Sequence, residues 1–384
     1  MSYTIRQIRE NLIGYHLASA ARYAGISVQR LDEIENGAEP SFYEMEELAH
    51  IYGIDSETLD QAQIDLRVGD SVRILASQDE FKDLDDAIRL KVVEAANAAK
   101  DLATLKVITG AEAASDIPAM SEFPTAATHP EPWAQGAEIA KVLRTKLALG
   151  TTEIASMRDL VIEGFPEISL LYARLGREGP AGITFADELR GRCIVINLDG
   201  KNTNPCVRRF SIAHELCHIL YDWHRTEPLA VISGYLEKLG REREQRANSF
   251  AVRFLCPESN LTPSLDPLNL VRNLTERFGI HYGAARLYIL NVLQKELSIQ
   301  PPPDLRDFSV HPRWTDAEEP IGIDGFPLQS VPPQRRTLIA QLAGRLYSQG
   351  QISRDRFAGF LGITPAEEVE LVLDFFSLDL PDAA

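Results

Sequence analysis

The stretch "RRFSIAHELCHILYDWH", residues 208–224, places three histidines, His214, His218 and His224, around a single glutamate, Glu215. His214 and His218 are four positions apart, so an α-helix would present both imidazoles on one face, where they can bind one metal ion. Glu215 is displaced from them by about 100° around the helix axis. In zinc peptidases with this H-E-x-x-H pattern, the glutamate activates a water molecule held by the metal without binding the metal itself.

The residues around this pattern predict a buried helix. They are mostly apolar and compatible with a helix: Phe210, Ile212, Ala213, Leu216, Ile219 and Leu220. Ionisable side chains on a buried helix need partners, because burying them alone costs free energy. A metal ion would provide such a partner. The alternative is a core helix whose histidines are only hydrogen-bonded.

A catalytic zinc site needs a third protein ligand, and His224 is the nearest candidate. Its spacing is that of the metzincin motif, but Tyr221 stands where that motif has the glycine that turns the chain back toward the metal. All four methionines precede the motif, so the methionine turn that follows it in metzincins is absent. A histidine near the carbonyl groups of a helix end is the alternative role for His224.

The second candidate is Glu244, in "REREQRANSFAVRFL", residues 241–255. Helical periodicity places Glu242 on the polar face of this segment. The opposite face is formed by Glu244, Ala247, Ala251 and Phe254. Glu244 is therefore expected to point inward, where metal binding would satisfy a carboxylate that is costly to bury alone. A buried salt bridge to a nearby arginine is the alternative.

Two stretches together resemble one peptidase family. "RRFSIAHELCHIL", residues 208–220, followed by "EREQRANSFAVRFLCP", residues 242–257, is similar to the ImmA/IrrE family of metallopeptidases. The resemblance extends back through "GITFADELRGRCIVINL", residues 182–198, and covers roughly residues 132–262. It implies a zincin-like α+β domain that cleaves peptide bonds.

The resemblance also implies the composition of the site. Zn²⁺ would be the cofactor and Glu215 the catalytic base, and the zinc ligands would be His214, His218 and Glu244. By analogy with zincins generally, we expect the strand around "CIVINL", residues 193–198, to be an edge strand that pairs with an extended substrate peptide.

Apolar residues at helical spacing predict a compact helical unit over residues 4–64. Ser27 is expected to cap a helix that runs to Glu35, and Gly37 follows as a residue that tolerates the left-handed conformation at a helix end. Two helices that meet over the turn before Ser27 form a helix-turn-helix.

This unit resembles the Xre-type, phage-repressor DNA-binding domains over residues 17–55. The resemblance implies that Ser27, Gln29 and Arg30 face the major groove of DNA. Its charge favours a different partner, because four arginines stand against twelve acidic residues between Arg6 and Asp65, a net charge of −8. The sequence is therefore compatible with two interpretations of this unit, a DNA-binding domain and a protein-binding module.

The predicted fold is multidomain. We expect a helix-turn-helix domain over residues 1–65, a helical spacer and Pro/Ala-rich linker over 66–131, a zincin-like peptidase domain over 132–299 and a helical module over 300–384. The long helix expected before residue 109 is either a spacer or a homodimer helix.

The amino-acid composition limits the kinds of molecule and surface that the protein is expected to bind. The net charge of −17 repels membrane surfaces and phosphate backbones, so any contact with DNA needs a local basic patch. The chain has no apolar run of membrane-spanning length and no signal peptide, which predicts a cytoplasmic protein. Four cysteines without a C-x-x-C pair are expected to be reduced thiols.

Two functions follow from these patterns. The first is a zinc endopeptidase that cleaves a regulatory protein, such as a transcriptional repressor, in a stress, mobile-element or toxin–antitoxin setting. The second is a DNA-binding transcriptional regulator or antitoxin, in which the zincin domain acts as a sensor or scaffold. The acidic N-terminal unit favours the first, and helical units that dock a partner protein are compatible with both.

Overall fold

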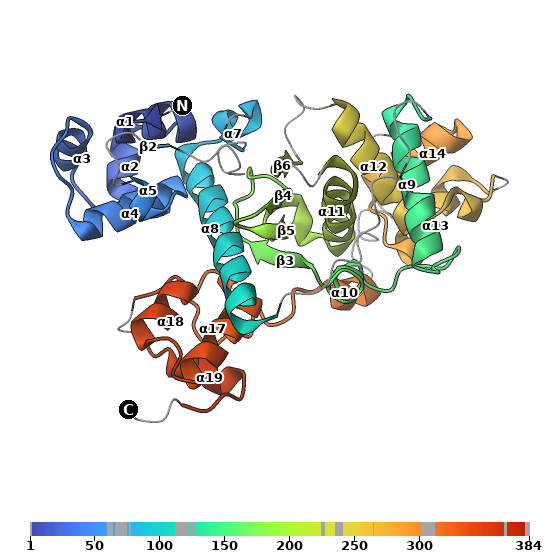
Figure 1. The fold of residues 1–384 in the computed structure, drawn as a ribbon. Helices are drawn as coiled ribbons and strands as arrows, with labels where there is room; N and C mark the ends of the chain where they lie inside the picture. Colours follow the sequence, from blue (N-terminus) through green and yellow to red (C-terminus); the bar gives the residue numbers. More distant parts are fainter. Residues whose placement is uncertain are drawn as a thin grey trace.

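The computed structural model places a mixed β-sheet between two layers of helices (Figure 1). The residues that the structure describes are 2–59, 64–65, 75–76, 78–111, 123, 128–223, 227–234, 241–263, 265–298, 300, 312–364 and 367–380. The helical N-terminal region, the α+β central region and the helical C-terminal region agree with the predicted fold class. No helix within the described residues has the length and apolarity needed to cross a membrane.

The N-terminal region is built from short helices, and Ser27 caps one of them as predicted. Its hydroxyl accepts a hydrogen bond from the Arg30 amide at 3.0 Å, and Gly37 follows with a φ of 101°. The helices are α1 (Ile5–Gln7), a π-helical segment (Ile8–Ile13), α2 (Leu17–Tyr23), α3 (Val28–Glu35), α4 (Phe42–Tyr52) and α5 (Ser56–Leu59). A short antiparallel pair, β1 (Ser2–Tyr3) with β2 (Ile64–Asp65), joins the two ends of this region.

The central sheet has the strand order β3-β5-β4-β6. Strand β5 runs parallel to β3 and antiparallel to β4, and β6 is antiparallel to β4. The strands are β3 (Ile168–Ala173), β4 (Gly182–Asp187), β5 (Gly191–Asn197) and β6 (Leu229–Ser233).

The expectation that residues 193–198 form an edge strand is wrong. Strand β5 is hydrogen-bonded on both sides, and all its residues from Cys193 to Asn197 are buried. An uninterrupted apolar run is typical of a strand covered on both faces, so "CIVI" indicated a central strand rather than an edge. The outer edge of β6 is covered at one point, where Gln78 Nε2 donates to the carbonyl of Ala230 at 2.6 Å.

One face of the sheet packs against α8 (Asp86–Thr109), which the N-terminal and C-terminal helices also contact. Alternate strand residues such as Leu171 and Val195 join this core, and the Arg335 guanidinium bonds Asp101 of α8 at 2.6 Å. The apolar face of α8 from Val92 to Leu105 is therefore covered within the same chain, whereas Val107 and Ile108 near its end are exposed. Around it lie α7 (Asp79–Asp83), α17 (Leu338–Ser348), α18 (Arg354–Leu361) and α19 (Glu370–Phe375).

The other face of the sheet supports α11, with α12 and α9 lying beyond it (Figure 1). Helices α9 and α12 approach each other closely, because a Cβ on Gly136 would lie 2.2 Å from the carbonyl oxygen of Arg246. Only glycine allows that approach. The helices of this layer are α9 (Pro132–Lys146), α10 (Met157–Gly164), α11 (Pro205–Cys217), α12 (Arg241–Leu255), α13 (Pro267–Phe278), α14 (Tyr282–Leu293) and α16 (Pro312–Ala317).

A buried ion pair anchors α11. Arg209 Nη1 donates to Glu318 Oε1 at 2.6 Å, and both side chains are fully buried. Glu318 also accepts hydrogen bonds from the amides of Met157 and Arg158 at the start of α10. The Arg209 guanidinium lies 4.4 Å from the ring centre of Trp314. The pair therefore holds α10, α11 and the segment after α16 together.

Replacing Glu318 by alanine is expected to destabilise the protein by about 3–5 kcal/mol, because it leaves the buried Arg209 charge without the carboxylate that neutralises it. Urea unfolding followed by tryptophan fluorescence would measure the change. The matched control is Glu319→Ala, at the exposed neighbouring position, for which we expect a change within about 0.5 kcal/mol. Equal unfolding midpoints for the two variants would contradict the anchoring role.

Candidate metal centre

The helix that carries the histidines begins at a well-formed cap. The Asn204 side chain accepts from the Cys206 amide at 2.8 Å, and Pro205 occupies the first helical position, where its missing N–H is not needed. The α-helix ends at Cys217, and the chain continues as a π-helical turn over His218–Asp222. Such turns are frequent at functional sites, because they change the direction of side chains within a helix.

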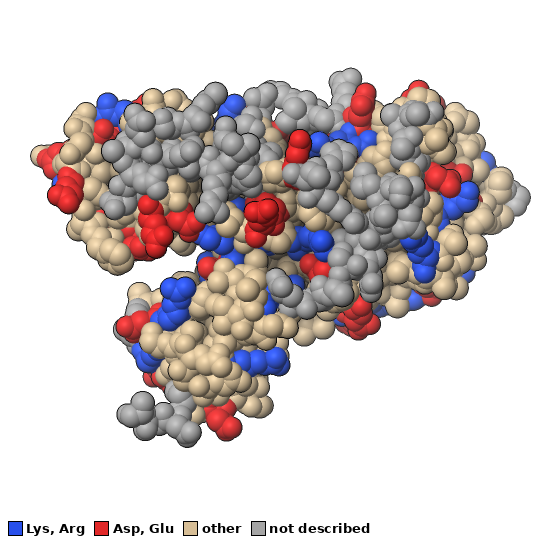
Figure 2. All heavy atoms as spheres, in the orientation of Figure 1, with Lys and Arg blue, Asp and Glu red and all other residues tan. Residues whose placement is uncertain are grey.

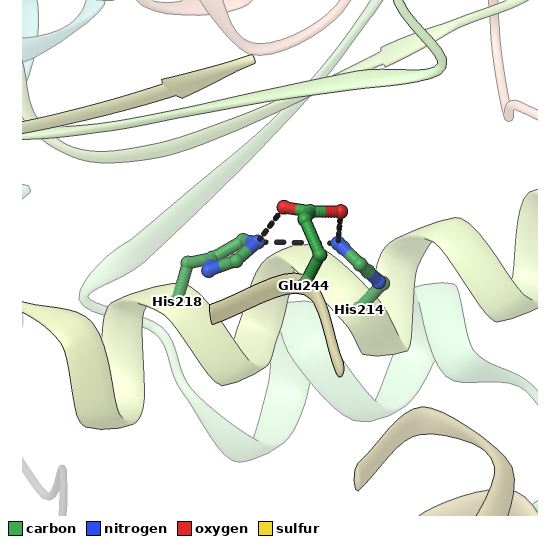
Figure 3. Close-up of side chains that lie close together, drawn as sticks. All are labelled: His214, His218 and Glu244. Carbon is green, nitrogen blue, oxygen red and sulfur yellow. Dashed lines mark hydrogen bonds and ion pairs between the residues drawn. The ribbon is translucent and has the colours of Figure 1, made fainter. Parts of the chain in front are cut away.

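Three of the predicted site residues meet at one point (Figure 3). Glu244 Oε2 lies 3.3 Å from His214 Nε2, and Glu244 Oε1 lies 3.6 Å from His218 Nε2. The two Nε2 atoms are 3.1 Å apart. In Figure 3 the carboxylate reaches across from α12 to the two imidazoles, which come from consecutive turns of one helical segment.

These donors fit a metal ion. Two imidazole nitrogens and one carboxylate oxygen, all within 4.8 Å of one another, form a donor set suited to a divalent transition metal. Both histidines are buried, whereas the Glu244 side chain is 30% exposed. The site is therefore reachable from solvent on the Glu244 side, as a catalytic metal requires.

The second nitrogen of each imidazole has its own partner. His218 Nδ1 lies 2.6 Å from Asp222 Oδ2, and His214 Nδ1 lies 3.1 Å from Asn248 Oδ1. These contacts turn both Nε2 atoms toward the centre and fix the ring orientations. Arg246 in turn bonds Asp222. Sequence reasoning missed these partners, although Asp222 is four residues after His218 and Asn248 four after Glu244.

Electrostatics couple the three donors. Burial opposes a charge on His214, but the Glu244 and Glu215 carboxylates and the Asn248 side chain together outweigh it and raise the pKa of His214 to about 9. Burial likewise opposes the charge on Glu244, yet the two histidines lower the pKa of that carboxyl. The donors therefore favour a positive charge between them, which is what a metal ion provides.

Glu215 lies beside the three donors but does not join them. Thr184 of β4 donates to its Oε2 at 2.7 Å, while Oε1 is buried and makes no close hydrogen bond within the described parts of the chain, although the nearby Ser233 hydroxyl also stabilises the carboxylate. A Cβ on Gly182 would lie 2.5 Å from Oε1, so glycine makes room for the carboxylate. Burial raises the pKa of Glu215. Glu215, His214 and Glu244 line one cleft of about 350 Å³.

His224 lies outside the described residues, so its alternative roles stay untested. Cys217, next to His218, is a free buried thiol whose pKa burial raises well above its ordinary value. A thiol with that pKa stays protonated and unreactive. The other three cysteines are also free and buried.

The three residues expected to face DNA form intramolecular contacts. Ser27 caps α3, Gln29 Nε2 donates to Glu33 at 3.0 Å, and Arg30 makes two bonds of 2.8 Å to the Glu44 carboxylate. Arg6 and Arg9 are paired with acids as well. Figure 2, drawn in the orientation of Figure 1, shows acidic side chains (red) spread over the region of α3 and α4.

Comparison with protein families supports both predicted domains. Residues 166–289 match the model of the IrrE N-terminal-like domain, a peptidase family, and residues 5–59 match the helix-turn-helix model. No curated protein matches the chain. The chain is thus metallopeptidase-related and has the ImmA/IrrE architecture with an N-terminal Xre-type helix-turn-helix domain.

Replacing Glu244 by alanine is expected to lower the affinity for zinc by more than about 100-fold, because even partners outside the coordination sphere contribute 10- to 100-fold. Zinc titration of the metal-free protein against a chromophoric chelator would measure it. Glu242→Ala, on the exposed side of α12, is the matched control and should bind zinc like the wild type. Loss of zinc in His224→Ala but not in Glu244→Ala would assign the third ligand to His224 instead.

Proposed function

We propose that the protein is a zinc-dependent endopeptidase of the gluzincin type, in which Glu215 is the catalytic base. The zinc ligands would be His214, His218 and Glu244. The observation that supports this proposal most strongly is that three metal-binding donors converge at one point, and that the separate Glu215 carboxylate shares a cleft with two of them, His214 and Glu244. A structural zinc site would have four protein ligands and no neighbouring base.

Each residue near the site has a role in this chemistry. Zinc, when bound, would act as a Lewis acid that polarises the peptide carbonyl and lowers the pKa of water toward about 7. Thr184 holds one oxygen of Glu215, so the unpartnered Oε1 is the atom that accepts the proton from water and passes it to the leaving amine. Asp222 and Asn248 keep the imidazoles aligned.

The substrate that we propose is a regulatory protein, such as a transcriptional repressor, in a stress, mobile-element or toxin–antitoxin setting. The pairing of a peptidase domain with a helix-turn-helix domain supports this choice. The helix-turn-helix domain would then either bring the enzyme to DNA-bound proteins or dock the substrate itself.

The Glu215→Gln variant is expected to retain zinc but to cleave at least about 100-fold more slowly, because removing a general base loses 10²- to 10⁴-fold in rate. Fluorescently labelled casein, an unfolded protein, would report the rate, and metal analysis would confirm loading. Glu242→Gln serves as the matched control and should cleave at the wild-type rate. Undiminished cleavage by Glu215→Gln would exclude this mechanism.

A second candidate function is a DNA-binding transcriptional regulator or antitoxin. The match of residues 5–59 to a helix-turn-helix supports it. The ion pairs of Arg6, Arg9 and Arg30 oppose it, because an arginine held by a carboxylate is not free to neutralise a phosphate.

We expect weak binding to duplex DNA, with a slope of log affinity against log salt concentration no steeper than about −2, since each phosphate contact contributes about −0.9. Fluorescence polarisation with the protein's own promoter would measure the slope. The variant Glu44→Gln loses the charge that holds Arg30. Its slope should be more negative than that of the wild type by at most about 0.9, the contribution of one phosphate contact. A wild-type slope near −6 or steeper would favour the regulator.

A further inference from the structure

The metal cleft adjoins a larger cavity. This second cavity, of about 870 Å³, shares three lining residues with the cleft: Phe210, Asn248 and His281. It lies between α12 and α14, with Trp133 of α9 at its rim. A third cavity of about 500 Å³ follows, and it shares Trp133 and Arg253 with the second. The three cavities therefore adjoin in series, and residues of α12 or directly after it line each of them.

The second cavity has an apolar character. Trp133 is 54% exposed and Leu287 is 47% exposed, although both side chains are large and hydrophobic. Phe210, Val252 and Ala284 contribute further apolar wall. Exposed apolar surface lining a concave site is typical of a ligand-binding groove, because covering it gains about 25 cal/mol per Å².

The size and the polar groups of the cavity suit a polypeptide. From Glu244 to Arg253 the helix rises about 14 Å, the length of about four residues of extended chain. Gln245 and Asn291 line the cavity with exposed amide side chains, which can both donate to and accept from a peptide backbone. A cavity of 870 Å³ holds several residues rather than one side chain.

We propose that this second cavity binds the substrate chain beside the scissile bond and takes a large apolar side chain, aromatic or aliphatic, between Trp133 and Leu287. The inference rests on the proposed peptidase function and names its substrate class, an extended segment with a bulky apolar residue near the cleavage site. Its continuity with the metal cleft identifies the substrate chain as the occupant.

Binding without turnover tests the groove directly. The full-length Glu215→Gln protein is titrated, by fluorescence anisotropy, into a fluorescein-labelled Gly/Ser decapeptide with Phe-Phe at its centre. The same peptide with Asp-Asp is the comparison. We expect the Phe-Phe peptide to bind at least about tenfold more tightly, because two buried aromatic side chains contribute well over 1.4 kcal/mol.

Two substitutions locate the binding. In the Glu215→Gln protein, Leu287→Glu and Trp133→Gln should each weaken binding of the Phe-Phe peptide by at least about tenfold, since a charge or a polar group replaces the apolar wall. Ile162→Glu is the matched control, because Ile162 is 50% exposed on α10 and lines none of the three cavities. Zinc content should stay equal in all of these proteins.

The results of these experiments distinguish a failure of the groove proposal from a failure of the peptidase proposal. The groove proposal fails if both peptides bind with equal affinity or if neither binds detectably. It also fails if neither Leu287→Glu nor Trp133→Gln changes the affinity. These results count against the groove whether or not the wild type cleaves casein. If the Phe-Phe peptide binds and the two variants weaken it, yet the wild type cleaves neither casein nor peptide, the groove stands and the peptidase proposal fails.

Discussion

The close packing of α12 against its neighbouring helices is the constraint on which the metal centre depends. Two of the three donors come from one helical segment, and the third reaches them only if α12 is held close and in the correct rotation. Gly136 permits the approach of α9 to α12, since any side chain there would collide with the Arg246 carbonyl. The fully buried Arg209–Glu318 pair anchors α11, the helix that carries His214.

The sheet completes the site by positioning the second carboxylate, that of Glu215. Strand β4 contributes Thr184, which holds one oxygen of Glu215, and Gly182, whose missing side chain leaves room for the other. Because the same strand also packs against β5 and β6, the carboxylate is held by the rigid centre of the fold. In the proposed mechanism, a carboxylate held in this way loses little conformational entropy when it acts as the base.

Sequence reasoning predicted the parts of the site that depend on local periodicity. The four-residue spacing and the inward face of residues 241–255 predicted the three residues that the structure brings together. The expectation that β5 is an edge strand is wrong because strand pairing is long-range, whereas the uninterrupted apolar run in β5 is typical of a central strand. The contact between Arg209 and Glu318 joins residues more than 100 positions apart, beyond the reach of any periodic pattern. The domain boundaries stay predictions, although α8 shares one core with the N-terminal and C-terminal helices.

In the proposed site, two imidazoles and the Glu244 carboxylate hold zinc beside Glu215. X-ray absorption spectroscopy at the zinc edge of the loaded full-length protein tests this most directly, because it counts and identifies the donor atoms. Our account predicts two histidine nitrogens at about 2.0–2.1 Å, further oxygen donors at about 2.0–2.2 Å and no sulfur. A sulfur contribution at about 2.3 Å would implicate a thiol such as Cys217, and three histidine nitrogens would implicate another histidine such as His224. Either result would contradict the proposed zinc site.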